Sequence, residues 1–250
     1  MNNSIKRIFV LTKRNIKEIF RDPLSLVFTI GLPILMEILF YLLFAKFTDQ
    51  FQMKYLAPGI IVFSQAFISL FVGLLISNDR SSSFLTRLYV SKAKSHEFII
   101  SYCLSIVPLI FVQSILFYVV GVIFDNSLLS INILYSILFS IVTSIFYIGG
   151  GVLIGSLCNE KSVGGIASIF ISGQSLLSGM WFPIEGLDST FINIMEFLPF
   201  RNATLLVQNA LNGYASLLVD LVKPLVIILV YGLIVILISI FIFKKQMKNK

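Results

Sequence analysis

Six long apolar stretches constrain this chain more than any other feature of its sequence. They cover residues 24–44, 56–77, 98–124, 131–157, 163–182 and 224–243. A helix needs about 20 mostly apolar residues to cross a bilayer, and each stretch reaches that length. Glu37 is the only acidic residue inside them, they contain no Lys or Arg, and none alternates in polarity as barrel strands do. We therefore predict an all-α membrane protein with six transmembrane helices.

The composition excludes the other broad classes of protein. Charged residues make up 12% of the chain, whereas soluble proteins carry about 25%. The 57% of hydrophobic residues exclude intrinsic disorder, and two cysteines are too few for a disulfide-stabilised scaffold. We expect one transmembrane domain over 1–250, with a helix at 1–22, the bundle at 24–243 and a basic tail at 244–250.

The distribution of Lys and Arg predicts the orientation. With six spans both chain ends lie on one side of the membrane, and 15 of the 19 Lys and Arg residues fall on that side. Because positive residues concentrate in cytoplasmic segments, both termini are predicted to be cytoplasmic. The net charge of +7 is then a consequence of topology. Nucleic-acid binding would need a basic face on a soluble domain, and we expect no nucleic-acid partner.

The basic segment before the first stretch has the periodicity of an amphipathic helix. Apolar residues recur every three or four positions through Ile5, Phe9, Ile16 and Phe20, cations fill the gaps, and the segment ends at Arg21. Such helices lie in the membrane interface, and we expect membrane lipid as a partner. A charged anchor without a specific task is the alternative. The segment lacks the short apolar region and cleavage site of a secretory signal.

The connection at 78–97 contains an apolar cluster that a simple loop would not need. Phe84, Leu85, Leu88, Tyr89 and Val90 lie in its middle, between polar ends. A short helix there would present an apolar face on the cytoplasmic side. Either membrane headgroups and helix ends cover that face, or a cytoplasmic partner docks on it.

The outer segment 183–223 predicts two short helices before the last span. Apolar residues crowd into 191–198, Asp188 is a candidate helix cap, and Pro199 separates this piece from 203–211. Each piece is too short to span a bilayer. We predict a two-piece re-entrant helical hairpin that dips into the outer leaflet; a folded outer cap without moving parts is the alternative.

Glu37 is the only ionisable acid inside the six predicted spans. Intramembrane carboxylates usually face protein or a water-filled path, so Glu37 can contact a polar substrate, bond to a hydroxyl or be protonated. The sequence has no metal-ligand cluster and no hydrolase motif, and 155–162 lacks the second glycine of a phosphate-binding loop. We therefore expect no catalytic residue, no metal site and no cofactor bound by this chain.

Three motifs occur together in the order of a known family. The interfacial helix ends in Arg21, Asp22 and Pro23, the segment 79–88 has the form DR…LTRL, and 181–187 reads WFPIEGL ahead of 197–199, FLP. With these motifs the whole chain resembles the type-2 exporter family of ABC transporter permeases.

The resemblance implies roles for particular residues. It places Phe84, Leu85, Arg87, Leu88 and Tyr89 in a coupling helix that docks into an ATPase, with Asn159, Glu160 and Lys161 as a second contact. It makes the segment with Ile5, Phe9, Ile16, Phe20 and Arg21 an elbow helix on the membrane. It assigns Trp181, Phe182, Pro183, Phe191, Met195 and Phe197 to an extracellular gate.

The resemblance also implies partners and a mechanism. The permease would pair with a second copy or a related permease and with two cytoplasmic ABC ATPase subunits, which bind ATP and Mg. It would lie in the plasma membrane and move its substrate outward by alternating access. The apolar, aromatic-rich spans with few internal charges suit an amphipathic drug, lipid or peptide, and the richness in Ile, Lys, Asn and Phe suggests a bacterium. The alternatives are a polysaccharide exporter permease, a scaffold or regulatory subunit without transport, and an ATP-independent transporter.

Overall fold

The computed structural model describes residues 3–82, 95–184 and 186–248, with the side chains of 4–82, 96–184 and 186–242. All elements in these ranges are helical. In chain order they are α1 (Asn3–Arg21), α2 (Pro23–Leu26), η1 (Val27–Gly31), α3 (Leu32–Phe44), η2 (Asp49–Phe51), α4 (Met53–Ser81), α6 (Ser95–Phe124), η3 (Asn126–Leu128), α7 (Asn132–Leu157), α8 (Glu160–Leu177), α9 (Ser189–Phe197), α10 (Pro199–Asn212), η4 (Leu217–Val222) and α11 (Lys223–Lys248).

Five helical segments are long and apolar enough to cross a membrane, and they match five of the six predicted stretches. They are Pro23–Phe44, Met53–Ser81, His96–Phe124, Asn132–Leu157 and Leu217–Ile242. The remaining stretch contains α8, whose 18 residues begin with Glu160 and Lys161 and which is not among the five. Its predicted end at Phe182 was wrong. The helix stops at Leu177 because Gly179 has a φ of +69°, outside the range of a right-handed helix.

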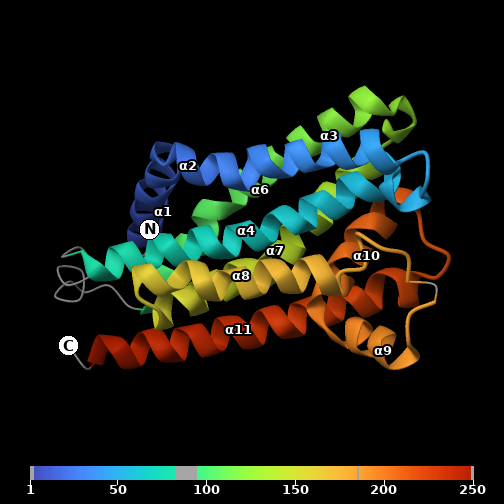
Figure 1. Cartoon of the computed structure of the whole chain (residues 1–250). Helices are drawn as coiled ribbons and strands as arrows, with labels where there is room; N and C mark the ends of the chain where they lie inside the picture. The colour runs from blue at the N-terminus through green and yellow to red at the C-terminus, as the bar shows by residue number, and fades with distance from the viewer. Residues whose placement is uncertain (1–2, 83–94, 185, 249–250) are drawn as a thin grey trace.

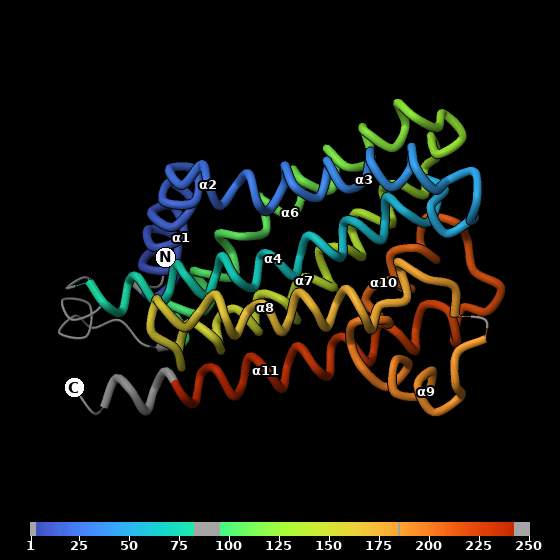
Figure 2. The backbone as a smooth tube through the Cα atoms, in the orientation of Figure 1, coloured from blue at the N-terminus to red at the C-terminus, as the bar shows by residue number. Residues whose placement is uncertain are grey.

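Helix α4 lies at the centre of the bundle (Figure 1) and packs against α6, α7, α8 and α10. In the apolar window of α4, 83% of the residues are buried, against 17% for the first and the last span. Both chain ends lie at one end of the bundle, here called the terminal end, while α9 and α10 lie at the opposite, distal end (Figure 2). The outer helices therefore turn most of their apolar surface away from the chain, as helices in lipid do.

Helix α1 confirms the predicted N-terminal helix and lies across the terminal end (Figure 1). Leu11, Asn15 and Ile19 are four residues apart and at most 9% exposed, so one face of α1 is buried against the bundle. The chain turns at Asp22, whose carboxylate accepts a hydrogen bond from the backbone N–H of Ser25 at 3.2 Å and caps α2. Pro23 then begins the first span.

Close packing of α7 on α4 depends on two glycines of a small-residue stripe. A Cβ atom on Gly151 would lie 2.7 Å from the carbonyl oxygen of Ser69, and one on Gly155 would lie 2.7 Å from that of Gly73. Only glycine allows the two backbones to approach this closely. Here the stripe joins two helices of the same chain.

The two short helices before the last span are present as separate pieces. Asp188 caps α9 by accepting a hydrogen bond from the N–H of Thr190 at 2.9 Å, and α10 begins at Pro199. Along α10, Ala203, Leu206 and Val207 are fully buried against the bundle. The depth of the two helices in a membrane stays a prediction.

Candidate functional site

The last turn of α4, at the terminal end of the bundle, contains three consecutive polar residues, Asn78, Asp79 and Arg80, which we call the α4 junction. Successive residues of an α-helix point about 100° apart, so the three side chains reach different neighbours. The junction lies directly before 83–94, which the structure does not describe. The predicted coupling residues Phe84, Leu85, Arg87, Leu88 and Tyr89 lie in that segment, outside the described residues.

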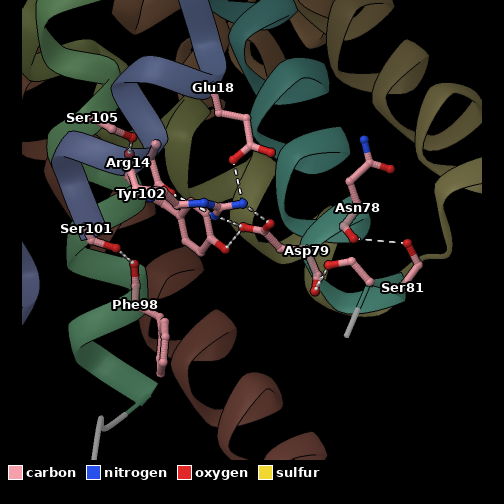
Figure 3. A network of polar contacts seen from close by, with 11 residues as sticks. Arg14, Glu18, Asn78, Asp79, Ser81, Phe98, Ser101, Tyr102 and Ser105 are labelled. Carbon is pink, nitrogen blue, oxygen red and sulfur yellow. Dashed lines mark hydrogen bonds and ion pairs between the residues drawn. The ribbon is translucent and has the colours of Figure 1, made fainter. Parts of the chain in front are cut away.

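Asp79 joins α4 to α1 and α6 (Figure 3). Its two oxygens accept hydrogen bonds from the guanidinium of Arg14 at 2.5 and 2.6 Å, and one of them also accepts from the hydroxyl of Tyr102 at 2.5 Å. The side chain of Asp79 is 3% exposed and that of Arg14 is 31% exposed. This is a bidentate, largely desolvated ion pair, the geometry that makes Arg–carboxylate contacts strong and specific.

Glu18 contacts the same arginine from one turn further along α1, with 2.6 Å between its carboxylate oxygen and the guanidinium. Burial lowers the pKa of Arg14, but the hydrogen bonds and charge of Asp79, with the charge of Glu18, outweigh burial and leave that pKa above its ordinary value. Burial raises the pKa of the Glu18 carboxyl, and the charge of Arg14 offsets the rise only in part. Arg14 is therefore a permanent cation held between two acids.

Arg80 joins α4 to the end of α7. Its guanidinium donates to the backbone carbonyls of Gly155 at 2.7 Å, Ser156 at 2.6 Å and Cys158 at 3.2 Å. The last carbonyls of a helix have no partner within it, and they carry the negative end of the helix dipole. Arg80 thus caps α7 where the chain passes into the connection that leads to α8.

Asn78 faces that same connection, which carries the predicted second contact. When the amide nitrogen of Asn78 faces Glu160, it lies 3.1 Å from each of the two carboxylate oxygens of Glu160. Asn159 caps α8 by accepting from the N–H of Ser162 at 3.1 Å. Asn159, Glu160 and Lys161 are all exposed. The structure therefore brings these three residues to the α4 junction, beside the start of the segment with the other predicted coupling residues.

A second ion pair fastens the other end of α1 to α6. Arg7 donates to Glu97 from Nε at 2.9 Å and from Nη2 at 2.7 Å, and the hydroxyl of Ser4 bonds to the same carboxylate. The hydrogen bond to Glu97 raises the pKa of Arg7. Because Glu97 is fully buried, α1 is held at two points to the helices on either side of the segment 83–94.

The predicted interfacial residues lie on the free face of α1. Ile5, Phe9 and Phe20 are 56%, 67% and 58% exposed, Ile16 is half-buried and Arg21 is exposed. Ile5, Phe9, Ile16 and Phe20 fall within about 60° of one another around the helix, whereas Arg21 lies on the face of Lys13 and Lys17. An apolar stripe of this kind is what a helix in a membrane interface presents to lipid.

The predicted gate residues divide between two places at the distal end. The Trp181 ring packs on Phe40 with centroids 4.6 Å apart and on Phe63 with centroids 5.4 Å apart. Phe182 and Phe191 instead line an apolar groove of about 460 Å³ beside α8. Met195 is fully buried, whereas Pro183 and Phe197 are exposed. The structure thus brings Phe182 and Phe191 together and separates them from Trp181.

Glu37 lies within the bundle on α3. It is 0% exposed, and among the described residues neither of its oxygens has a hydrogen-bond partner. A Cβ atom on Gly121 of α6 would lie 3.7 Å from Oε1. Glu37 therefore faces the α3–α6 contact rather than an open path.

A belt of polar side chains inside the bundle was not predicted from the sequence. Gln113 donates to Ser64 at 2.9 Å, Gln65 to the carbonyl of Ser140 at 2.7 Å, and Gln174 to Thr204 at 3.0 Å. These bonds join α6 to α4, α4 to α7, and α8 to α10. The sequence does contain evidence for this belt, because each of the three glutamines interrupts an apolar stretch. The Arg14–Asp79 pair was not predicted either, although the sequence shows that Asp79 follows closely on a long apolar stretch.

A comparison with protein families assigns the chain. The model of the family described as ABC-2 type transporter matches residues 6–211. The chain belongs to this family. The match runs from α1 through most of α10 and includes the α4 junction. The resemblance seen in the sequence is confirmed, and the chain is a multi-pass ABC transporter permease, a membrane transport component of the kind that works with ATPase subunits. A search among curated proteins finds no match.

No group of three or more His, Cys, Asp or Glu side chains within the described ranges could hold a metal ion. Among the described acids of the terminal end, Glu18, Asp79 and Glu97 contact arginines, Glu160 faces the amide of Asn78, and Asp22 caps α2. These contacts and the hydrogen bonds of Arg80 join α4 to α1, α6, α7 and α8.

Proposed function

We propose that this chain is the permease subunit of an ATP-driven exporter in the plasma membrane. Both termini face the cytoplasm, the permease pairs with a second copy or a related permease, and two cytoplasmic ATPase subunits dock on the terminal end. ATP and Mg are bound by those subunits. The exporter moves an amphipathic drug, lipid or peptide outward.

The α4 junction carries this proposal. Its three side chains contact α1, α6, the end of α7 and the start of α8, and the segment with the predicted ATPase contacts follows shortly after it in the chain. A force applied to that segment reaches four helices through charge-assisted hydrogen bonds, which are stronger than neutral ones. Alternating access requires packed helices with two arrangements, and the junction is where a partner could select between them.

The groove beside α8 supports an amphipathic substrate. Ile169, Leu176, Phe182 and Phe191 line it together with Ser168 and Ser172, so an apolar group with a polar edge fits its surface. Glu37 is fully buried and meets a substrate only in a state in which α3 and α6 separate. We therefore propose that the apolar part of the substrate contacts the groove, and that Glu37 contacts the substrate only after α3 and α6 have separated.

The test is a charge placed at the predicted docking face. In vesicles containing the permease and its ATPase partner, Leu88→Glu should abolish substrate-stimulated ATP hydrolysis and transport while the protein still inserts. Leu129→Glu is the matched control, since Leu129 is 76% exposed and lies between α6 and α7 at the distal end. Normal transport by Leu88→Glu at normal membrane levels would contradict the coupling assignment.

A further inference from the structure

A cleft of about 760 Å³ lies between α1 and α4 at the terminal end of the bundle. The side formed by α1 and the turn after it contributes Val10, Lys13, Arg14, Lys17, Glu18, Arg21 and Asp22, and α4 contributes Phe71, Leu74, Leu75 and Asn78. The first wall thus carries four cations and two acids, and the second is mostly apolar. The ABC-2 type transporter family assignment and the proposed ATPase contacts leave this cleft without a role.

Of the four cations that line the cleft, Arg14 is paired with Asp79 and Glu18, and the other three have no ion pair among the described residues. Lys13, Lys17 and Arg21 follow one another at intervals of four residues, so they share one face of α1. All three are exposed. The acids nearby are engaged elsewhere: Glu18 with Arg14, and Asp22 with the cap of α2.

The apolar wall continues into a second, narrower groove along the first span. This groove has a volume of about 220 Å³ and is lined by Leu24, Phe28, Phe67 and Leu70. It shares Phe71 and Leu74 with the cationic cleft. The cationic cleft is thus continuous with an apolar groove between the first span and α4.

We propose that this composite site binds an anionic phospholipid of the bilayer. The phosphate lies among Lys13, Lys17 and Arg21, and one acyl chain runs past Phe71 and Leu74 along the first span. Basic pockets between membrane helices recognise anionic headgroups in this way. A zwitterionic lipid carries its own cation beside the phosphate, so it gains less from three unpaired positive charges. The bound lipid would fix α1 against α4 next to the Arg14–Asp79 pair.

The test uses the purified full-length chain in mild detergent, with an equimolar mixture of phosphatidylglycerol and phosphatidylcholine. Native mass spectrometry counts the lipids retained. We expect one phosphatidylglycerol retained in preference to phosphatidylcholine. Each lysine near an anionic headgroup contributes about five-fold in affinity, so Lys13→Gln/Lys17→Gln should weaken retention about 25-fold. The control Lys46→Gln/Lys54→Gln removes the same charge at the distal end and should change nothing.

Two further arms use the unaltered chain and do not depend on how a variant folds. Glycerol phosphate at millimolar concentration should not displace the lipid, because it cannot fill the groove, and short-chain phosphatidylglycerol should bind more weakly than the long-chain form. Displacement by glycerol phosphate would show a free-phosphate site and overturn the proposal. Equal retention of the two lipids, or undiminished retention by the Lys13 and Lys17 variant, would overturn it as well.

Discussion

The pair formed by Arg14 and Asp79 should contribute more to the stability of this permease than any exposed ion pair. Removing one partner of a buried pair costs about 3–5 kcal/mol, because the other charge is left uncompensated. Arg14 is 31% exposed and keeps Glu18 at 2.6 Å, so part of that penalty is relieved by water and by the second acid. For Asp79→Asn, which can still accept from Tyr102, we expect about 2–3 kcal/mol.

A double-mutant cycle isolates the pair from these side effects. Arg14→Gln, Asp79→Asn and the double variant are compared in reversible unfolding of the purified chain in mixed micelles. The expected coupling energy is about 1.5–3 kcal/mol, since both residues share one hydrogen-bonded network. The double variant should be little worse than Asp79→Asn alone, because the uncompensated arginine is no longer present.

The control cycle uses Lys223 and Glu196, which lie 3.0 Å apart with side chains 52% and 46% exposed. An exposed pair of this kind should give about 0–1 kcal/mol. If the Arg14–Asp79 coupling fell below about 0.5 kcal/mol and matched this control, the α4 junction would not be the strong contact described here.

Three other predictions follow from single positions. The raised pKa of Glu18 means that the folded state binds its proton more tightly than the unfolded state. The stability gained by Glu18→Gln should therefore grow as pH rises through and above about 4.3 and then level off; a gain that shrank with pH would contradict this. Gly155→Ala should destabilise the subunit by about 1–3 kcal/mol through overpacking, whereas Gly165→Ala, with open space around it, should be neutral or mildly stabilising in the same unfolding assay. Glu37→Met should stabilise the subunit by about 1–3 kcal/mol, because it removes a buried carboxyl group that has no hydrogen-bond partner among the described residues; destabilisation in that assay would show that Glu37 has a partner.

The helices could be predicted from the sequence because each rests on a local requirement. A bilayer demands long apolar stretches, and five of them were found as helices. Four lie within about four residues of their expected bounds, whereas the last begins at Leu217, seven residues earlier than expected. The breaks at Pro23 and Pro199 follow from the chemistry of proline, and the helix of α1 follows from its periodicity. The end of α8 was misplaced because the apolar pattern continues past Gly179, whereas the backbone turns there.

The site was harder to predict because it depends on pairings between distant residues. Arg14 and Asp79 are 65 residues apart, and no spacing rule connects them. Ile19 and Phe20 are adjacent apolar residues of α1, yet Ile19 is 1% exposed and Phe20 is 58% exposed. Apolar character alone does not separate a face that meets lipid from one that meets protein. Trp181 and Phe182 show the same limit, since neighbours in an irregular segment point to different surroundings.

The position of the α4 junction explains how a contact at one end could be felt at the other. Helix α4 is 29 residues long, about 44 Å, and it is the most buried candidate span. At the terminal end its last turn holds α1, α6 and α7 through Asp79 and Arg80. Further along, Ser64 and Gln65 bond to α6 and α7 within the polar belt. A displacement of the junction must therefore shift the polar belt or break the charge-assisted bonds first. Since those bonds are the stronger of the two, we expect the polar belt to rearrange.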